Sequence, residues 1–360
     1  MRRFIPQSWT DRVALIYIAL TVTTIVVLVL QTVVFAAPYV NPVWTNTSPS
    51  PESPVPSVAA LAISPEGVDV RTGELIWSHF LFRTPGVLED NVFGFTWRSM
   101  LSGSSQLGNR VIPSWEMTAQ YQVLLPGTPN VPFGHQVLIR RRSGRVDTFL
   151  WNGTAYNSPA NVFDTLTGTT GTGFVLTDIH ACTYRLDLLG MPQTFTDQNA
   201  NFDTWNYNAV YQVTSITDER GKTYATTFNL NGYMASITDP ANRTWTFGYD
   251  LADNLTTITT PATTDQPTGI VTTLGYDGQG RLTSVTDGRG NTVGQFAYAG
   301  ATTQSGSVTI DGNAVRYSYA TGVTTRTDRT GNVHRSYFAG QQITKTDMLV
   351  GGQSKYATLY

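Results

Sequence analysis

Apolar and polar positions alternate along much of the second half of the chain. At Trp245, Phe247 and Tyr249, large aromatic side chains recur at every second position, with threonine or glycine between them, and the same alternation returns at 224–228 and 315–319. Because successive side chains of a β-strand point to opposite faces, this period of two predicts strands with an aromatic and a threonine-rich face. We therefore expect an all-β fold of antiparallel sheet, with the aromatic face covered and the other face in water.

The alternation is organised as a repeat. The phrase Ser-Ile-Thr-Asp ends at Asp218 and again, 21 residues later, at Asp239; it returns as Thr-Ile-Thr-Thr ending at Thr260 and as Ser-Val-Thr-Asp ending at Asp287. The extra residues before the last copy fit into a turn at 261–269. A strand ending in Thr-Asp, a turn with Gly or Asn and an aromatic second strand form a β-hairpin. We expect a curved array of such hairpins over residues 184–360.

The first strand of each hairpin leaves the register open. Leu282 and Val285 are three positions apart, so they belong on opposite faces of a regular strand. They share a face only if a β-bulge lies between them, and the sequence does not choose between these alternatives.

The amino terminus predicts export. After Arg12 the chain carries no charged residue until Glu52, and residues 13–35 are long enough for a helix that crosses a membrane. Residues 1–37 form either a signal peptide, with small residues before a cleavage point at Ala37, or an uncleaved membrane anchor. Either alternative gives an extracytoplasmic protein, anchored to the cell membrane or secreted. Residues 38–65 follow as a Pro-rich extended linker, and residues 66–183 as an amino-terminal β region.

The composition excludes several kinds of binding partner and cross-link. Only 13% of the residues are charged and the net charge is −2, so no basic surface for a nucleic acid is expected. The single cysteine, Cys182, excludes an intramolecular disulfide and a thiolate zinc site. Stability therefore has to come from packing and backbone pairing.

Two segments carry a resemblance to a known family. The units at 249–259 and 276–287, each opening on Tyr-Asp, resemble the YD repeats of the Rhs family, and 68–75 with 97–99 resembles the segment that opens an Rhs shell. The resemblance covers about residues 66–360. At 180–181, His-Ala stands where the family usually has an Asp-Gly turn. The resemblance implies part of a hollow β-shell that encases a carboxy-terminal effector; no segment matches the family's core region or a toxin.

No constellation of residues predicts chemistry. His79, His135, His180 and His334 lie far apart with no carboxylate at metal-ligand spacing, and no hydrolase or phosphate-loop motif is present. Residues 197–203 resemble the start of a calcium loop, but Phe202 and Asn208 replace the required Gly and Glu, which favours a plain Asx turn. Asp250 and Asp277 are interpreted as strand-end caps. We predict no catalytic, cofactor or metal site and no enzyme activity.

These observations predict a structural protein. The expected function is a segment of an Rhs-type shell that encases or presents an effector or an adhesive surface, with a further shell segment or an effector chain as partner. The alternative is a stand-alone module at the cell surface that binds carbohydrate through exposed aromatic strands. The basic run at 140–142 with Arg145 is interpreted as a solvated hairpin end, or else as a contact for an anionic wall polymer.

Overall fold

The computed structural model describes residues 63–86, 91–123, 134–142, 145–160, 162–340 and 342–359. The predicted signal or anchor at 1–37, and the linker up to residue 62, lie outside these residues. Within the described residues, no helix has the length and apolar character needed to cross a bilayer. Of the described residues, those within 63–206 and 213–359 belong to one compact unit, and residues 207–212 fall outside it.

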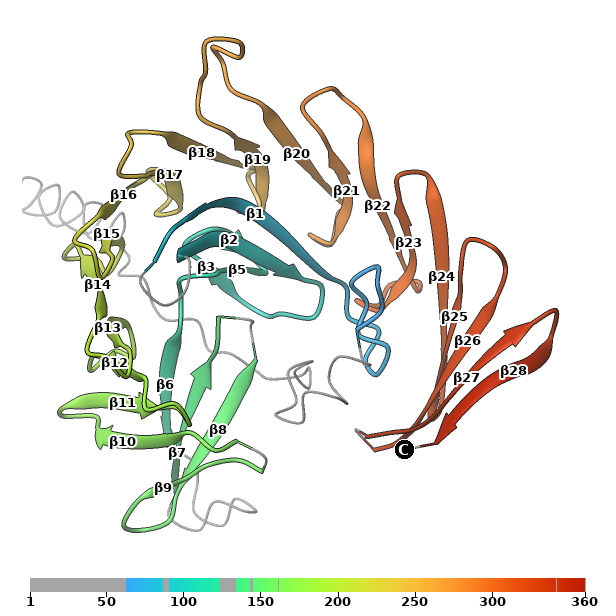
Figure 1. Cartoon of the computed structure of the whole chain (residues 1–360), viewed down its shortest axis with the longest axis horizontal. Helices are drawn as coiled ribbons and strands as arrows, with labels where there is room; N and C mark the ends of the chain where they lie inside the picture. Colours follow the sequence, from blue (N-terminus) through green and yellow to red (C-terminus); the bar gives the residue numbers. More distant parts are fainter. Residues whose placement is uncertain are drawn as a thin grey trace, which may run out of the picture. The chain divides into compact units, whose positions relative to one another are not determined.

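One long antiparallel sheet contains most of the described chain. It has 19 strands among the described residues, and each strand pairs with the next one in sequence (Figure 1). The strands are β10 (Thr165–Thr169), β11 (Gly173–Thr177), β12 (Thr183–Leu186), β13 (Pro192–Thr196), β14 (Phe202–Tyr207), β15 (Val213–Thr217), β16 (Thr223–Phe228), β17 (Met234–Thr238), β18 (Thr244–Tyr249), β19 (Leu255–Thr259), β20 (Val271–Tyr276), β21 (Leu282–Thr286), β22 (Thr292–Tyr298), β23 (Ser305–Ile310), β24 (Asn313–Ala320), β25 (Val323–Thr327), β26 (Val333–Ala339), β27 (Gln342–Val350) and β28 (Gln353–Leu359). The prediction of an all-β fold built from antiparallel hairpins is confirmed.

Three smaller sheets precede the long one. They contain β1 (Ile76–Thr84), β2 (Asn91–Arg98) and β5 (Val111–Pro113); β3 (Ser104–Ser105) and β4 (Gly108–Asn109); and β6 (Thr118–Val123), β7 (His135–Arg140), β8 (Val146–Trp151) and β9 (Tyr156–Asn157). The long sheet begins at β10, upstream of the predicted array, so hairpin addition starts before recognisable repeats do. The predicted division of the chain at residue 184 stays a prediction.

The register question is settled by a bulge. Gly275 pairs with Ser284 and Tyr276 pairs with Leu282, so Thr283 is an extra residue without an opposite partner. Leu282 and Val285 are consequently both buried, with 0% and 3% of their surfaces exposed. The same shift recurs at the ends of β16, β18, β22 and β26. Bulges bend a strand and increase its twist, so each repeat introduces a bend at the same position.

The hairpin turns are built around one side-chain oxygen of an Asp or Asn residue. Oδ1 of Asp277 accepts hydrogen bonds from the backbone N–H of Gln279 at 2.9 Å and of Arg281 at 3.0 Å. The residue before Arg281, Gly280, has φ of 68°, a left-handed conformation that glycine adopts without strain. The same pair of bonds recurs at Asp178, Asp187, Asp197, Asn208, Asp218, Asn229, Asp239, Asp250, Asp287 and Asp328. Consecutive hairpin turns of an antiparallel sheet lie at opposite ends of its strands. The same type of Asx turn therefore closes the hairpins at both ends.

The tyrosines at the strand ends tie adjacent strands together. The hydroxyl of Tyr249 donates to the backbone carbonyl of Met234 at 2.8 Å, and Tyr276 donates to Leu255 at the same distance. Tyr298 and Tyr319 repeat the contact farther along the sheet. In each case the acceptor is the first residue of the neighbouring strand. Burial raises the pKa of all four phenols, because the charged form is disfavoured away from water.

The amino-terminal β region covers the aromatic face, as the alternation predicted. The Phe82 ring stacks on Trp245 with centroids 4.1 Å apart, and Phe93 lies 4.4 Å from Tyr224. In Figure 1, β1 and β2 accordingly lie alongside the strands that carry these rings. Backbone bonds join the same layers, since the N–H of Met234 donates to the carbonyl of Gln106 at 2.7 Å. The apolar core of the molecule therefore lies between the two parts of the chain.

A buried ion pair joins the two pieces of the segment at 68–75 and 97–99. Arg98 donates to Oε1 of Glu74 at 3.1 Å and to Oε2 at 2.5 Å, and both side chains are almost fully enclosed. The carboxylate of Glu74 also accepts the backbone N–H of Met100 at 3.3 Å. A buried charge requires a partner of opposite charge, so removing either Glu74 or Arg98 would leave the other charge unpaired.

Candidate binding cavity

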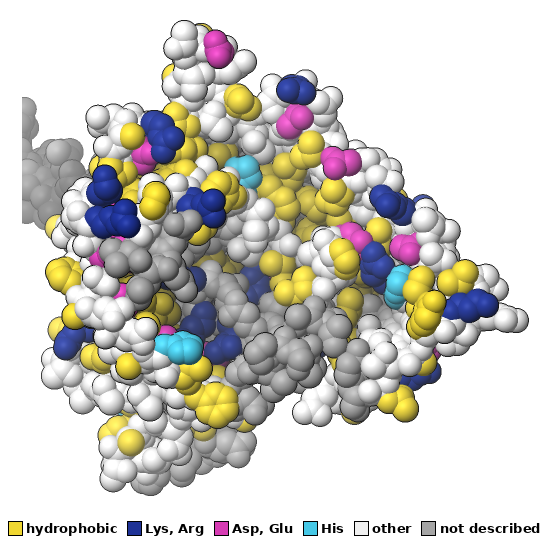
Figure 2. Space-filling model, viewed as in Figure 1, with side chains coloured by type: hydrophobic (Ala, Val, Ile, Leu, Met, Phe, Trp, Pro, Cys, Tyr) yellow, Lys and Arg dark blue, Asp and Glu magenta, His cyan; other side chains and the backbone are white. Residues whose placement is uncertain are grey.

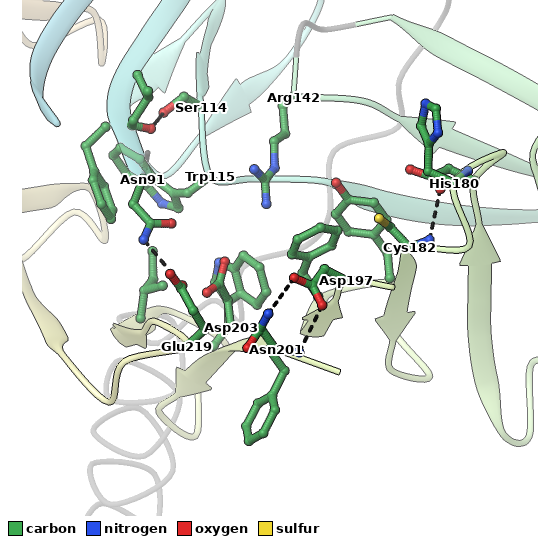
Figure 3. A pocket seen from close by; sticks show the side chains of 18 of the residues that line it. Asn91, Ser114, Trp115, Arg142, His180, Cys182, Asp197, Asn201, Asp203 and Glu219 are labelled. Atoms are coloured by element: carbon green, nitrogen blue, oxygen red, sulfur yellow. Dashed lines mark hydrogen bonds between the residues drawn. The ribbon is translucent and has the colours of Figure 1, made fainter. Parts of the chain in front are cut away.

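A cavity of about 630 Å³ lies between the amino-terminal β region and the early strands of the long sheet. Asn91 and Trp115 line it on one side, and strands β12–β14 with the turn after β15 line it on the other (Figure 3). Arg142, which follows β7, points into the space between these walls. The volume is within the range of about 300–1,000 Å³ that small-molecule sites occupy.

Two carboxyl groups share a hydrogen bond on one wall of this cavity. Asp203 lies in β14 and Glu219 in the turn after β15, and their side chains are hydrogen-bonded to each other. Burial, the hydrogen bond to Glu219 and the charge of Glu219 together raise the pKa of Asp203 to about 7, although the positive charge of Arg142 opposes the rise. Asn91 Nδ2 donates to Oε2 of Glu219 at 3.5 Å. Asp203 is therefore partly protonated near neutral pH, and the pair carries a net negative charge.

Two donors on the walls have no acceptor. The guanidinium carbon of Arg142 lies 5.7 Å from the ring centroid of Tyr184 and 5.8 Å from that of Phe195. Its Nε is buried without a hydrogen-bond partner, and within the described chain Arg142 forms no ion pair. Trp205 is 5% exposed, and its indole Nε1–H is also without an acceptor. Polar groups left in this state are costly, so the cavity favours an occupant that accepts hydrogen bonds.

Comparison with protein families identifies the repeats. Residues 228–265 and 262–292 match the family model RHS Repeat. The chain contains RHS repeats. The matched residues contain the two Tyr-Asp units, from β16 to the start of β22, so the hairpin with its Asx turns and bulge is the structure of the RHS repeat here.

The solved structures to which the chain is similar are remote in sequence. The crystal structure of TcdB2-TccC3 has 10% identity over 75% of this chain and 17% of that chain, with a TM-score of 0.37. TcdB2-TccC3-TEV has 12% identity over 78% and 18%, with a TM-score of 0.33, and the Photorhabdus luminescens Tc holotoxin pore has 11% identity over 79% and 20%, with a TM-score of 0.24. The chain thus spans about a fifth of the length of those chains. A search of curated proteins found no match.

The calcium-like segment of the RHS chain is used as a turn. Oδ1 of Asp197 accepts the backbone N–H of Asn199 at 2.7 Å and of Asn201 at 2.9 Å, and Oδ2 accepts the Asn201 side chain at 2.8 Å. Those hydrogen bonds lower the pKa of Asp197. Among the residues that the structure describes, no three His, Cys, Asp or Glu side chains are placed to hold a metal ion.

The histidines lie on separate elements. Burial lowers the pKa of His79, whose ring lies 5.5 Å from that of Phe95, while His135 lies against aromatic rings near β8 and His334 against Asp328. His180 and Cys182 line the cavity, but Asp178 accepts their backbone N–H groups at 2.8 and 2.9 Å. The carboxylate of Asp178 therefore stabilises its own turn.

The interpretation of 140–142 and 145 as a solvated hairpin end is wrong. Arg140 is 1% exposed and pairs with Glu116, while Arg141 and Arg145 both pair with Asp147 at 2.7 Å. Acidic residues on neighbouring elements draw these arginines inward, which a local sequence pattern does not reveal. Elsewhere charges are scattered among uncharged side chains on the face seen in Figure 2.

The cavity residues were not predicted from the sequence. Arg142, Asp203 and Glu219 lie 16 residues or more apart, and each occupies an ordinary strand-end or turn position. Only the pairing of β12–β16 and the docking of the amino-terminal region bring them to one cavity. The one available signal was Asp203, an acid in a strand that contains three aromatic residues.

Proposed function

We propose that this chain is a non-enzymatic wall segment of an RHS-type shell that works outside the cytoplasm. The observation that carries the proposal is the long sheet of RHS hairpins, in which every described strand pairs with its sequence neighbour. Such a sheet grows by adding hairpins, and the recurring bulges bend it in one sense. A wall of this kind encloses or presents an effector or an adhesive surface.

The two faces suit a wall. One face is packed against β1 and β2, whereas the other carries hydroxyl pairs such as Thr238 and Thr244, whose oxygens are 2.9 Å apart. A dry inner layer and a hydroxyl-rich outer layer give a stable sheet that remains wet on one side. This arrangement supports a structural role and requires no catalytic group.

The proposed partner is a further shell segment or an effector chain. The names of the related structures pair two components, TcdB2 and TccC3. In this chain β28 pairs with β27, and its side chains are exposed, Tyr356 at 73% and Leu359 at 79%. An exposed edge strand is a template for a further strand, so we propose that another segment adds there.

The carbohydrate-binding alternative requires exposed aromatic rings on the strands of the repeats. Trp245 and Phe247 are only 5% and 8% exposed, because the amino-terminal region covers their strands. Buried rings offer no face for a sugar to stack on. We therefore do not propose this alternative.

The test is fractionation of native cells with an antibody raised against residues 190–350. The proposal expects the chain in the membrane or extracellular fraction, with a reversible crosslinker converting it into a species of higher mass. A chain confined to the cytoplasmic fraction contradicts the export proposal. A chain that remains a monomer at every crosslinker concentration contradicts the proposed partner.

A further inference from the structure

We infer that the cavity between β2, β12 and β14 binds a zwitterion of amino-acid or dipeptide size with an apolar side chain. Its carboxylate would lie at Arg142 and Trp205, its ammonium group at Asp203 and Glu219. The inference rests on three features of the walls: two donors without acceptors, an acidic pair and a set of aromatic rings.

The carboxylate position follows from the unpartnered donors. A guanidinium binds a carboxylate through two parallel N–H bonds, and the rings of Tyr184 and Phe195 fix the orientation of the Arg142 plane. The Trp205 indole supplies a neutral donor on the same cavity and is 5% exposed. A neutral ligand such as a sugar provides no carboxylate for this bidentate contact.

The ammonium position follows from the carboxyl pair. Asp203 and Glu219 are hydrogen-bonded to each other, and Asn91 Nδ2 donates to Glu219 from the opposite wall. An ammonium group offers three donors and a positive charge, which lets both carboxyl groups ionise. Figure 3 shows the Arg142 side chain on one side of the space and the two acids on the other.

Charge balance distinguishes the zwitterion from simpler ions. Arg142 carries one positive charge and the acidic pair a net negative charge, so a zwitterion compensates both. A simple anion leaves the acidic pair uncompensated, and a simple cation leaves Arg142 uncompensated. Asp178 and Asp197 also line the cavity, but their carboxylates are bonded to amides of their own turns.

The side chain of the ligand is expected to be apolar. Aromatic rings form much of the remaining wall, those of Phe93, Trp115, Tyr184 and Phe195. Phe93 lies 5.6 Å from Trp115, and Tyr184 lies 4.6 Å from Phe195, so rings line both sides. Rings in such surfaces pack offset or edge-on against further rings, which favours an aromatic ligand side chain.

Titration calorimetry on the full chain tests the inference with matched probes. L-phenylalanine and the dipeptide of two phenylalanines are expected to bind, whereas N-acetyl-L-phenylalanine, L-phenylalaninamide and glycine bind at least tenfold more weakly. Failure of both zwitterions to bind at 10 mM overturns the inference. Equal binding of methyl glucoside also overturns it, since that result assigns a sugar site.

Variants separate the two ends of the ligand. Arg142→Gln is expected to weaken L-phenylalanine by about tenfold to a hundredfold, because a charge-assisted bidentate contact is lost. Arg316→Gln, an exposed arginine on β24, serves as the matched control and leaves binding unchanged. Trp205→Phe removes only the indole donor and tests the same end if Arg142→Gln does not fold. Unchanged affinity in both cavity variants contradicts the inference.

The pH dependence tests the ammonium end. Arg142 and Asp218 are the charged groups that act on the carboxyl pair besides its own members, while His180 also lines the cavity. Because the ammonium group favours the ionised pair, binding releases a proton, and affinity rises by up to about tenfold between pH 6 and pH 8. Asp203→Asn should abolish this rise. A pH-independent affinity in the wild type contradicts the assignment of the ammonium group.

Discussion

Replacement of Phe82 by alanine tests how the amino-terminal region holds the sheet. The Phe82 ring is 5% exposed and stacks on Trp245 at 4.1 Å and on Phe93 at 4.7 Å. Removing a buried phenylalanine loses about 2–3 kcal/mol of transfer free energy. The loss of stacking adds about 0.5–1.5 kcal/mol. We expect Phe82→Ala to lower the free energy of unfolding by about 3–4 kcal/mol.

Urea unfolding of the full chain, followed by circular dichroism and tryptophan fluorescence, measures this change. With a slope of about 3 kcal/mol per M, the midpoint falls by about 1 M. Phe80 lies two residues earlier on the same strand and is 60% exposed. Phe80→Ala is therefore the matched control, expected to change stability by less than about 0.5 kcal/mol.

The comparison between the two variants tests whether β1 stabilises the sheet. If Phe82→Ala shifts the midpoint no more than Phe80→Ala does, β1 does not stabilise the sheet by covering its aromatic face. The account of the core given above would then be wrong, because the rings of Trp245 and Phe93 would be stable without this cover.

Three further perturbations test other contacts by the same unfolding assay. Tyr276→Phe should lower the free energy of unfolding by about 1–2 kcal/mol, because the carbonyl of Leu255 loses a buried donor. Above pH 10 the Tyr276 phenol ionises only in the unfolded chain, because burial raises its pKa in the folded state. The wild type should therefore lose up to about 1.4 kcal/mol per pH unit from this group, a loss that the variant does not show. Asp239→Ala should cost about 1–3 kcal/mol by removing the acceptor for two turn amides, whereas Asp239→Asn, which retains Oδ1, costs less than half as much. Arg98→Met should cost about 3–5 kcal/mol because it leaves Glu74 charged and buried, and adding Glu74→Leu should restore most of the loss; no restoration contradicts the role of the ion pair.

Local chemistry explains why the hairpins were predictable. The phrase ending at Asp239 specifies its own turn, because the carboxylate bonds to amides two and four residues away. Alternation at Trp245 and Phe247 identifies the buried face without knowledge of what covers it. Both features depend on residues close in sequence, so the sequence contains the information needed to predict them.

Contacts between distant residues account for what was not predictable. The face shared by Leu282 and Val285 depends on Thr283 being displaced from the pairing, which the residue types themselves leave undecided. Arg142 reaches Tyr184 and Phe195 only after β7 has docked beside the long sheet. Burial of Arg140 likewise depends on Glu116, 24 residues away. Tertiary pairing, not local preference, decides these positions.

The extent of the amino-terminal cover explains why identical hairpins differ in burial. The cover contacts the sheet from Tyr184 in β12 to Arg326 in β25, where Glu66 accepts Nε of the guanidinium at 2.9 Å. Within this interval the inward side chains are buried, as Ile237 and Val308 are at 0% exposure. On β28, beyond the last such contact, Tyr356 is 73% exposed although its strand pairs in the same way. On β28, hairpin pairing therefore provides hydrogen-bond partners for the backbone but does not exclude water from the inner face. In the proposed shell, another segment would cover β28, as β1 and β2 cover the earlier repeats.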